Sequence, residues 1–119
     1  MADRIIDRGG VPVLVCDAEG APIAGPQDAL DLIGAAYAGA DVVAIPAGRL
    51  DDNFYRLNTG VAGEIMQKFV NYRVRLAVVG DISAHVAASG ALRDLVYESN
   101  KGNQVWFVND LQELDGHLR

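Results

Sequence analysis

Polar side chains that could do chemistry are concentrated in two short stretches, RLDDNFYRLNTG and GDISAH. The candidate ligand- or partner-binding residues are Arg49, Asp51, Asp52, Asn58, Thr59 and Gly60 in the first stretch and Asp81, Ser83 and His85 in the second. Carboxylate, hydroxyl and imidazole groups can transfer protons, and a guanidinium binds anions. The pattern therefore raises three hypotheses: a binding site, a catalytic site, or a set of helix caps.

The capping hypothesis accounts for much of the pattern. Asn58 or Thr59 is a good N-cap for a helix that begins near Val61, and such a cap stabilises a helix by about 1 kcal/mol. Asp81 follows an apolar run and can cap the next helical turn. Arg49 can form an ion pair with one of the nearby aspartates, which would turn the apparent site into a structural cluster.

The catalytic hypothesis depends on His85, which lies four residues after Asp81. Catalytic triads are defined by geometry, and this spacing matches no known nucleophile motif. His117 and Cys16 are far from His85 in the sequence, so the chain offers no metal-ligand spacing. We therefore assign no catalytic residue, and we expect no metal and no cofactor. Cys16, in the apolar run VPVLVC, is expected to be a core residue.

Composition restricts the class of protein. The 119 residues include 50% hydrophobic and 22% charged side chains, which predicts a single globular α/β domain over residues 1–119. The net charge of −6 argues against nucleic acid and anionic membranes as partners. The charged start, MADRIID, lacks the apolar stretch of a signal peptide, and a single cysteine fits a reducing compartment. We expect a cytoplasmic protein.

The order of the elements follows from hydrophobic periodicity. Two strands, 4–8 and 11–16, flank a Gly9-Gly10 turn and should form a hairpin. Three further apolar strands, DVVAIP, RLAVVG and QVWFV, alternate with helical patterns that begin near Pro26, Val61 and Gly90. A last helix is expected after Asp110, and 81–89 is expected to be irregular or a single turn. The predicted order is ββαβαβαβα, with a mixed five-stranded sheet.

This order places both polar stretches at the carboxyl ends of parallel strands. In open α/β sheets, ligands bind at that edge, where the strand order reverses. We therefore expect the RLDDN, NTG and GDISAH segments to lie near one another and to form one pocket. The N-terminus of the helix after Gly60 would favour an anion there.

The strand, loop and helix of DVVAIPAGRLDDNFYRLNTGVAGEI, together with the element order, resemble the STAS-like fold of bacterial anti-sigma-factor antagonists. In that family a hydroxyl residue at the start of the helix can be phosphorylated, and the surface around it docks a partner kinase. Thr59 before Gly60 would correspond to that hydroxyl residue, although this loop is longer and carries Phe54, Tyr55 and Arg56. The resemblance implies a regulatory module with a protein partner.

The longer stretch from LDDNFYRLNTG to NQVWFV is similar to an uncharacterised bacterial family, known only as a domain of unknown function. We therefore expect a non-enzymatic regulatory or interaction module that binds a protein partner, or a copy of itself, through the helix after Gly60 and the loop before it. The alternative is a small anionic-ligand binder or an enzyme that uses the pocket of the three polar segments.

Overall fold

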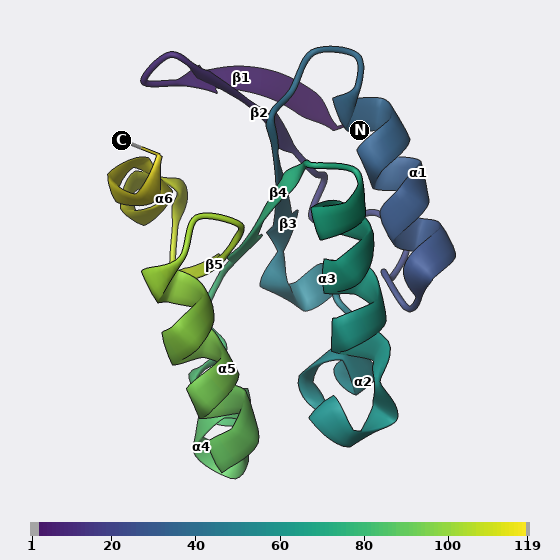
Figure 1. The fold of residues 1–119 in the computed structure, drawn as a ribbon, viewed down its shortest axis with the longest axis vertical. Helices are drawn as coiled ribbons and strands as arrows, with labels where there is room; N and C mark the ends of the chain where they lie inside the picture. Colours follow the sequence, from purple (N-terminus) through teal and green to yellow (C-terminus); the bar gives the residue numbers. More distant parts are fainter. Residues whose placement is uncertain (1–2, 119) are drawn as a thin grey trace.

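The computed structural model describes residues 3–118, which build one five-stranded sheet with helices packed against it (Figure 1). The predicted domain limits at residues 1 and 119 lie outside the described residues. Strands β1 (Arg4–Arg8) and β2 (Val11–Val15) form the expected antiparallel hairpin. Gly9 and Gly10 join them with φ angles of 63° and 92°, which non-glycine residues rarely adopt.

The remaining elements confirm the predicted order and add two short helices to it. The other strands are β3 (Val42–Pro46), β4 (Arg75–Val79) and β5 (Val105–Val108). The helices are α1 (Pro26–Ala36), α2 (Asp52–Tyr55), α3 (Val61–Asn71), α4 (Ser83–Ala88), α5 (Gly90–Lys101) and α6 (Leu111–His117), with 3-10 turns η1 (Ala47–Arg49) and η2 (Leu57–Thr59). Both α2 and α4 occupy segments that the sequence analysis treated as loop or as a single turn.

The strands lie in the simple order β1-β2-β3-β4-β5, and β2 to β5 are parallel. Because parallel crossovers are right-handed, a sheet that advances in one direction places its crossover helices on one face. The buried residues of α1, α3 and α5 accordingly belong to one core cluster. The described sheet contains no reversal of strand order, so the reversal point expected from sequence is absent from it.

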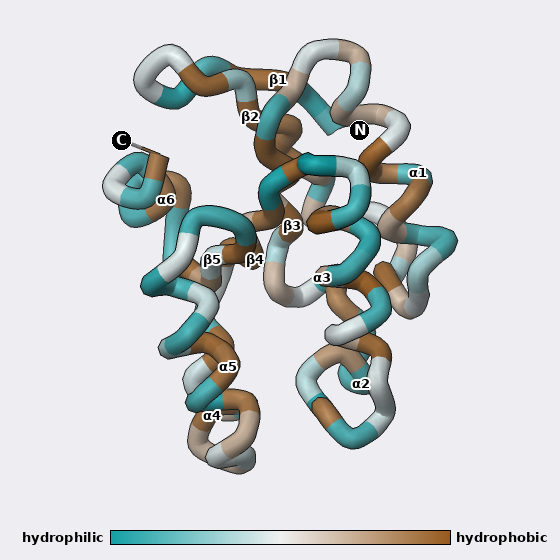
Figure 2. Tube along the Cα trace, viewed as in Figure 1, coloured by the Kyte–Doolittle hydropathy of each residue, from teal (hydrophilic) through white to brown (hydrophobic). Residues whose placement is uncertain are grey.

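Side chains of the central strands alternate between two cores. On β5, for example, Val105 and Phe107 face the crossover helices, whereas Trp106 and Val108 face the opposite side. Strands β3 and β4 alternate in the same way, as the pleat of a strand requires. Figure 2 shows hydrophobic residues along the central strands, and β3 and β5 are buried on both faces.

Helix α6 covers the second face of the sheet. Asp110 caps it by accepting a hydrogen bond from the Glu113 N–H at 2.8 Å, as predicted. Leu114 is fully buried against the sheet, and Arg8 at the end of β1 donates two hydrogen bonds to the Asp115 carboxylate at 2.8 and 2.7 Å. The first described strand and the last described helix are thus joined directly.

The three crossover helices are spaced unevenly. Helix α1 packs directly on α3, and the Tyr37 hydroxyl donates to the Tyr72 carbonyl oxygen at 3.1 Å beyond the ends of both helices. Helix α5 instead packs against β5 and α4. In Figure 1, α3 and α5 run side by side in the same direction, with their N-terminal ends near α2 and α4. None of the described helices is both long enough and apolar enough to span a bilayer.

Candidate functional site

Arg49 supports a loop instead of facing the other polar candidates. Its guanidinium donates to the carbonyl oxygen of Asp17 at 2.9 Å and twice to that of Ala21, at 3.1 and 2.8 Å. A Cβ atom at Gly20 would overlap this guanidinium, so the loop closes around it. Within the described residues Arg49 forms an ion pair with Asp3, at 4.0 Å, and the predicted pairing with Asp51, Asp52 or Asp81 is wrong.

The aspartates after Arg49 begin the short helix α2. Asp51 is its N-cap and accepts the Asn53 N–H, and Asp52 occupies the first turn. The helix turns Phe54 and Tyr55 into the core, where Phe54 is fully buried. The Tyr55 hydroxyl donates to the Ala47 carbonyl oxygen at 2.8 Å, and burial, followed by the charge of Asp52, raises the pKa of Tyr55 to about 12. The segment predicted as a loop is therefore a short helix with two buried aromatic residues.

The entrance to α3 differs from the predicted cap. Gly60 is the N-cap, with a φ angle of 83°, so the assignment of Asn58 or Thr59 to that position is wrong. The Thr59 hydroxyl lies within 2.7 Å of the Asn53 carbonyl oxygen and 2.8 Å of the Arg56 carbonyl oxygen. It also accepts the Val61 N–H at 3.3 Å. A glycine is favoured at position 60 because only glycine adopts this left-handed conformation without strain.

Asp81 and Ser83 form a local turn before α4. The Asp81 carboxylate accepts the Ser83 N–H at 2.8 Å, and this bond, assisted by the Ser83 side chain, lowers the pKa of Asp81. Both residues line a small cavity of about 300 Å³ near the ends of β4 and β5. Asn109 and Glu113 also line it. The capping prediction for Asp81 therefore holds only in part: Ile82 is the N-cap of α4, and Asp81, one residue earlier, accepts the N–H of the first helical residue.

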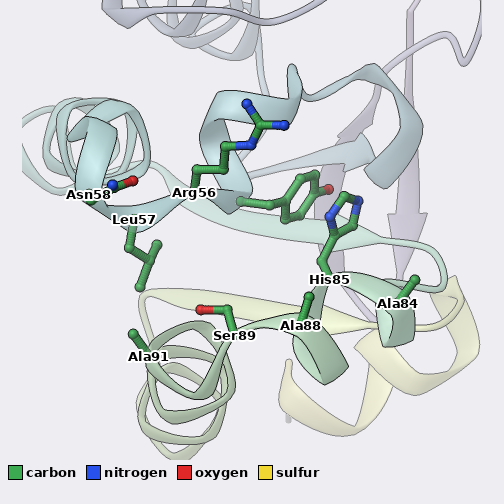
Figure 3. Close-up of a pocket in the computed structure, with 9 residues that line it drawn as sticks. Arg56, Leu57, Asn58, Ala84, His85, Ala88, Ser89 and Ala91 are labelled. Atoms are coloured by element: carbon green, nitrogen blue, oxygen red, sulfur yellow. The ribbon is translucent and has the colours of Figure 1, made fainter.

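His85 contacts Tyr55 of α2 and lines a different cavity from Asp81. Its ring stacks on Tyr55 with centroids 4.0 Å apart and an interplanar angle of 11°. The stack borders a cavity of about 570 Å³ that also contains Arg56, Asn58 and Ser89. Figure 3 shows Arg56, Leu57 and Asn58 on one side of it and the residues of α4 and the start of α5 on the other. Of the nine predicted residues, only Asn58 and His85 line this cavity.

A second, more apolar cavity of about 450 Å³ lies between α3 and α5. Its lining residues are Leu57, Gly60, Ala62, Gly63, Met66, Gln67, Val70, Leu95 and Val105. A third cavity of about 310 Å³ continues along the same helices and shares Met66, Val70 and Val105 with it. Leu57 also borders the His85 cavity, so the three cavities adjoin one another. We call the three cavities together the α3–α5 groove.

Apart from Asn58, Gly60 and His85, the residues that form this groove were not predicted as site residues. In α3 the apolar residues that recur at helical spacing are Val61, Ala62, Ile65, Met66, Phe69 and Val70, a pattern that indicates a core-facing side. The structure buries Ala62, Ile65 and Phe69, but Val70 is 45% exposed and Met66 is only partly buried. An apolar stripe wider than the face that meets the sheet was the available signal.

The described residues include neither a reactive thiol nor a cluster of metal-binding side chains. Cys16 is buried, and burial raises the pKa of its thiol to about 12, which disfavours the reactive thiolate. Within residues 3–118, no three His, Cys, Asp or Glu side chains gather in a way that could hold a metal ion. Arg49, Asp51, Thr59 and Asp81 each have at least one side-chain polar atom hydrogen-bonded to a backbone group. The α3–α5 groove is lined mainly by apolar side chains and contains few groups that could react.

Comparison with known proteins gives one match. A family model described as a domain of unknown function, DUF4180, matches residues 8–118. Neither the curated proteins nor the solved structures yield a match. The match covers every described strand and helix apart from the first residues of β1. The chain therefore belongs to the DUF4180 family.

Proposed function

We propose that this protein is a non-enzymatic regulatory module that binds a protein partner through the α3–α5 groove. The observation that carries the proposal is the apolar lining of the groove, which remains accessible although it crosses the centre of the helical face. Exposed apolar surface of this kind, bordered by polar residues, is typical of interaction sites. The predicted binding surface, α3 and the loop before it, forms one wall of this groove.

The regulatory part of the proposal is supported by the STAS-like element order. The hairpin, the sequential sheet and the strand–loop–helix unit that ends at Gly60 agree with that resemblance. Thr59, the residue that would correspond to the modified hydroxyl, is exposed next to Gly60 and Leu57, which line the groove. A phosphate on Thr59 would break its contacts with two carbonyl oxygens and add negative charge at this end of the groove.

The proposal is tested by selecting peptides from a random 15-residue display library on the immobilised protein. Val70→Glu places a charge in the groove, and Tyr97→Glu places the same charge on an α5 side chain that does not line it. Both native side chains are exposed, at 45% and 64%, so both variants should fold. Enriched peptides should bind Val70→Glu at least about tenfold more weakly and Tyr97→Glu unchanged. Peptides that bind both variants equally, or no enrichment, would refute the proposal.

The end of the groove near His85 supports a second candidate, the binding of a small anion. Arg56 forms no ion pair within residues 3–118, and Asn58 and His85 lie in the same cavity. A thermal-shift screen with carboxylates and phosphate monoesters tests it, because a ligand at about 100 times its Kd stabilises the protein by roughly 2.7 kcal/mol. A shift that survives in Arg56→Ala would place the anion elsewhere.

A further inference from the structure

The middle of the α3–α5 groove offers almost no hydrogen-bonding partners to whatever occupies it. Of the nine residues that line the central cavity, Gln67 alone has a polar side chain. Beyond the first turn of α3 and of α5, the backbone N–H groups that face the groove are used within those helices. An extended peptide would leave its own N–H and C=O groups unpaired there, whereas a helix satisfies them internally. The lining therefore favours a helix as the occupant.

The length of the groove fits about three helical turns. Helix α3 has 11 residues and α5 has 12, so each is roughly 16–18 Å long. Apolar side chains occur along the whole groove, from Leu57 and Ala91 at one end through Leu95 to Val70 and Val105 at the other. An occupying helix with apolar residues at i, i+4, i+7 and i+11 would place one side chain on each successive layer.

The charges along the groove define a direction. Helices α3 and α5 run in the same direction, so the positive ends of both dipoles lie at the end of the groove that contains Arg56 (Figure 1). Arg56 has no acidic partner within the described residues. At the far end, Glu98 is already paired with Lys101 at 3.3 Å. The negative, C-terminal end of an occupying helix is therefore favoured beside Arg56.

The overall charge of the chain narrows the choice of partner. A second copy would bring another −6 against the −6 of the first, and like net charges oppose association. A partner of net positive charge would instead be attracted over a long range. At the end of the groove near Arg56, the local positive charge instead favours an acidic group of the partner.

We propose that the groove binds an amphipathic helix of a basic partner protein, antiparallel to α3 and α5, with an acidic residue in the last turn of that helix next to Arg56. This inference rests on the function proposed above and specifies the partner. Apolar contacts along Met66, Val70 and Leu95 supply the affinity, and Arg56 with the two helix N-termini sets the orientation.

The sequences of the selected peptides give the first test. They should show apolar residues at i, i+4 and i+7, with Lys or Arg on the remaining face and Asp or Glu in the last turn. A proline in the middle of the strongest peptide should abolish binding, because it breaks a helix. Groove-dependent peptides with alternating, extended patterns would overturn the helix inference and leave the interaction module intact. A library without any groove-dependent peptide would refute the interaction module itself.

Two synthetic forms of the strongest peptide test the orientation. They have the same composition, with the acidic residue either in the last turn or in the first turn. The first form should bind about tenfold more tightly. Arg56→Glu should remove this preference, whereas Arg4→Glu, which makes the same change in net charge on an exposed residue of β1, should retain it. Equal affinity of the two forms, or equal effects of the two variants, would overturn the orientation.

Sedimentation of the protein alone tests the second copy as occupant. We expect a monomer at micromolar concentration. A dimer that disappears in Gly63→Leu would overturn the inference of a separate partner. This substitution is suitable because a Cβ at Gly63 meets no atom within 4 Å and the added side chain would occupy the groove. Gly34→Leu in α1 is the matched control, since Gly34 also has open space around it but does not line the groove.

Discussion

The two flanks of α3 differ although the same helix forms both. The flank toward α1 is packed more tightly: the two helices contact each other directly, and Tyr37 and Tyr72 meet edge to face with ring centroids 6.5 Å apart, although a cavity of about 410 Å³ remains beside Pro26 and Gly63. The flank toward α5 is open and forms the groove. The flank toward α1 contributes to stability through buried residues such as Ile33, whereas the open flank retains apolar surface whose burial needs another molecule. In the proposed function, stability and recognition therefore depend mainly on opposite sides of one helix.

The largest expected effect compares buried residues on the two flanks. Ile33 on α1 is 2% exposed, so Ile33→Ala should lower the free energy of unfolding by about 2–5 kcal/mol. Leu95 on α5 is only partly buried, so Leu95→Ala should lower it by about 1 kcal/mol. Urea denaturation measures both. Equal decreases in the free energy of unfolding would mean that the groove is closed in solution. The two flanks of α3 would then not differ.

The next largest effect on the free energy of unfolding concerns the hydrogen bonds that hold α5 against β5. The Asn100 side chain accepts the Phe107 N–H at 2.7 Å and donates to the Phe107 carbonyl oxygen at 3.1 Å, so it acts as a neighbouring strand for β5. Asn100→Ala leaves both groups without this partner and should lower the free energy of unfolding by about 1–3 kcal/mol.

Hydrogen exchange sharpens that prediction. In Asn100→Ala, amide exchange should accelerate in α5 and at Phe107 and remain slow in α1 and α3. Asn100→Asp, which keeps the acceptor for the Phe107 N–H, should show a smaller effect. Faster exchange throughout all the helices would show that the two flanks are not independent.

The smallest effect is a gain in stability. Gly63 is a helical glycine beside open space, so Gly63→Ala should raise the free energy of unfolding by about 0.8–1 kcal/mol. Gly34→Ala should raise it by a similar amount on α1, because Gly34 is also helical and unobstructed. Thermal unfolding of both variants provides the measurement. A destabilised Gly63→Ala would indicate that the open flank is covered within the chain itself.

Hydrophobic periodicity predicted the fold well. The five strands, the main helices and the Asp110 cap follow from local patterns, because a strand or an amphipathic helix reflects its surroundings in its own sequence. The short helices α2 and α4 were not predicted, since four to six residues are too few to display a period. Phe54 and Tyr55 show the consequence: two buried aromatic residues between polar neighbours resemble a loop.

The candidate site was harder to predict, because it depends on distances between elements. Arg49 and Asp81 are close to the other candidates in sequence order, yet Arg49 is bonded to the loop before α1 and Asp81 to its own turn. The groove arises from the separation of α3 and α5, which no local pattern encodes. Met66 and Val70 carried a partial signal, since they widen the apolar stripe of α3 beyond the part that reaches the core.

The bond between Arg8 and Asp115 also has a consequence for synthesis on the ribosome. Its two partners are separated by 107 positions in the chain. At about 5–20 residues per second, roughly 5 to 20 seconds pass between the translation of the first partner and that of the second. During this interval the hydrophobic side chains of β2 and β3 that later lie beneath α6 have no cover from the nascent chain. A chaperone that acts on this protein would therefore have its window before the last helix leaves the exit tunnel.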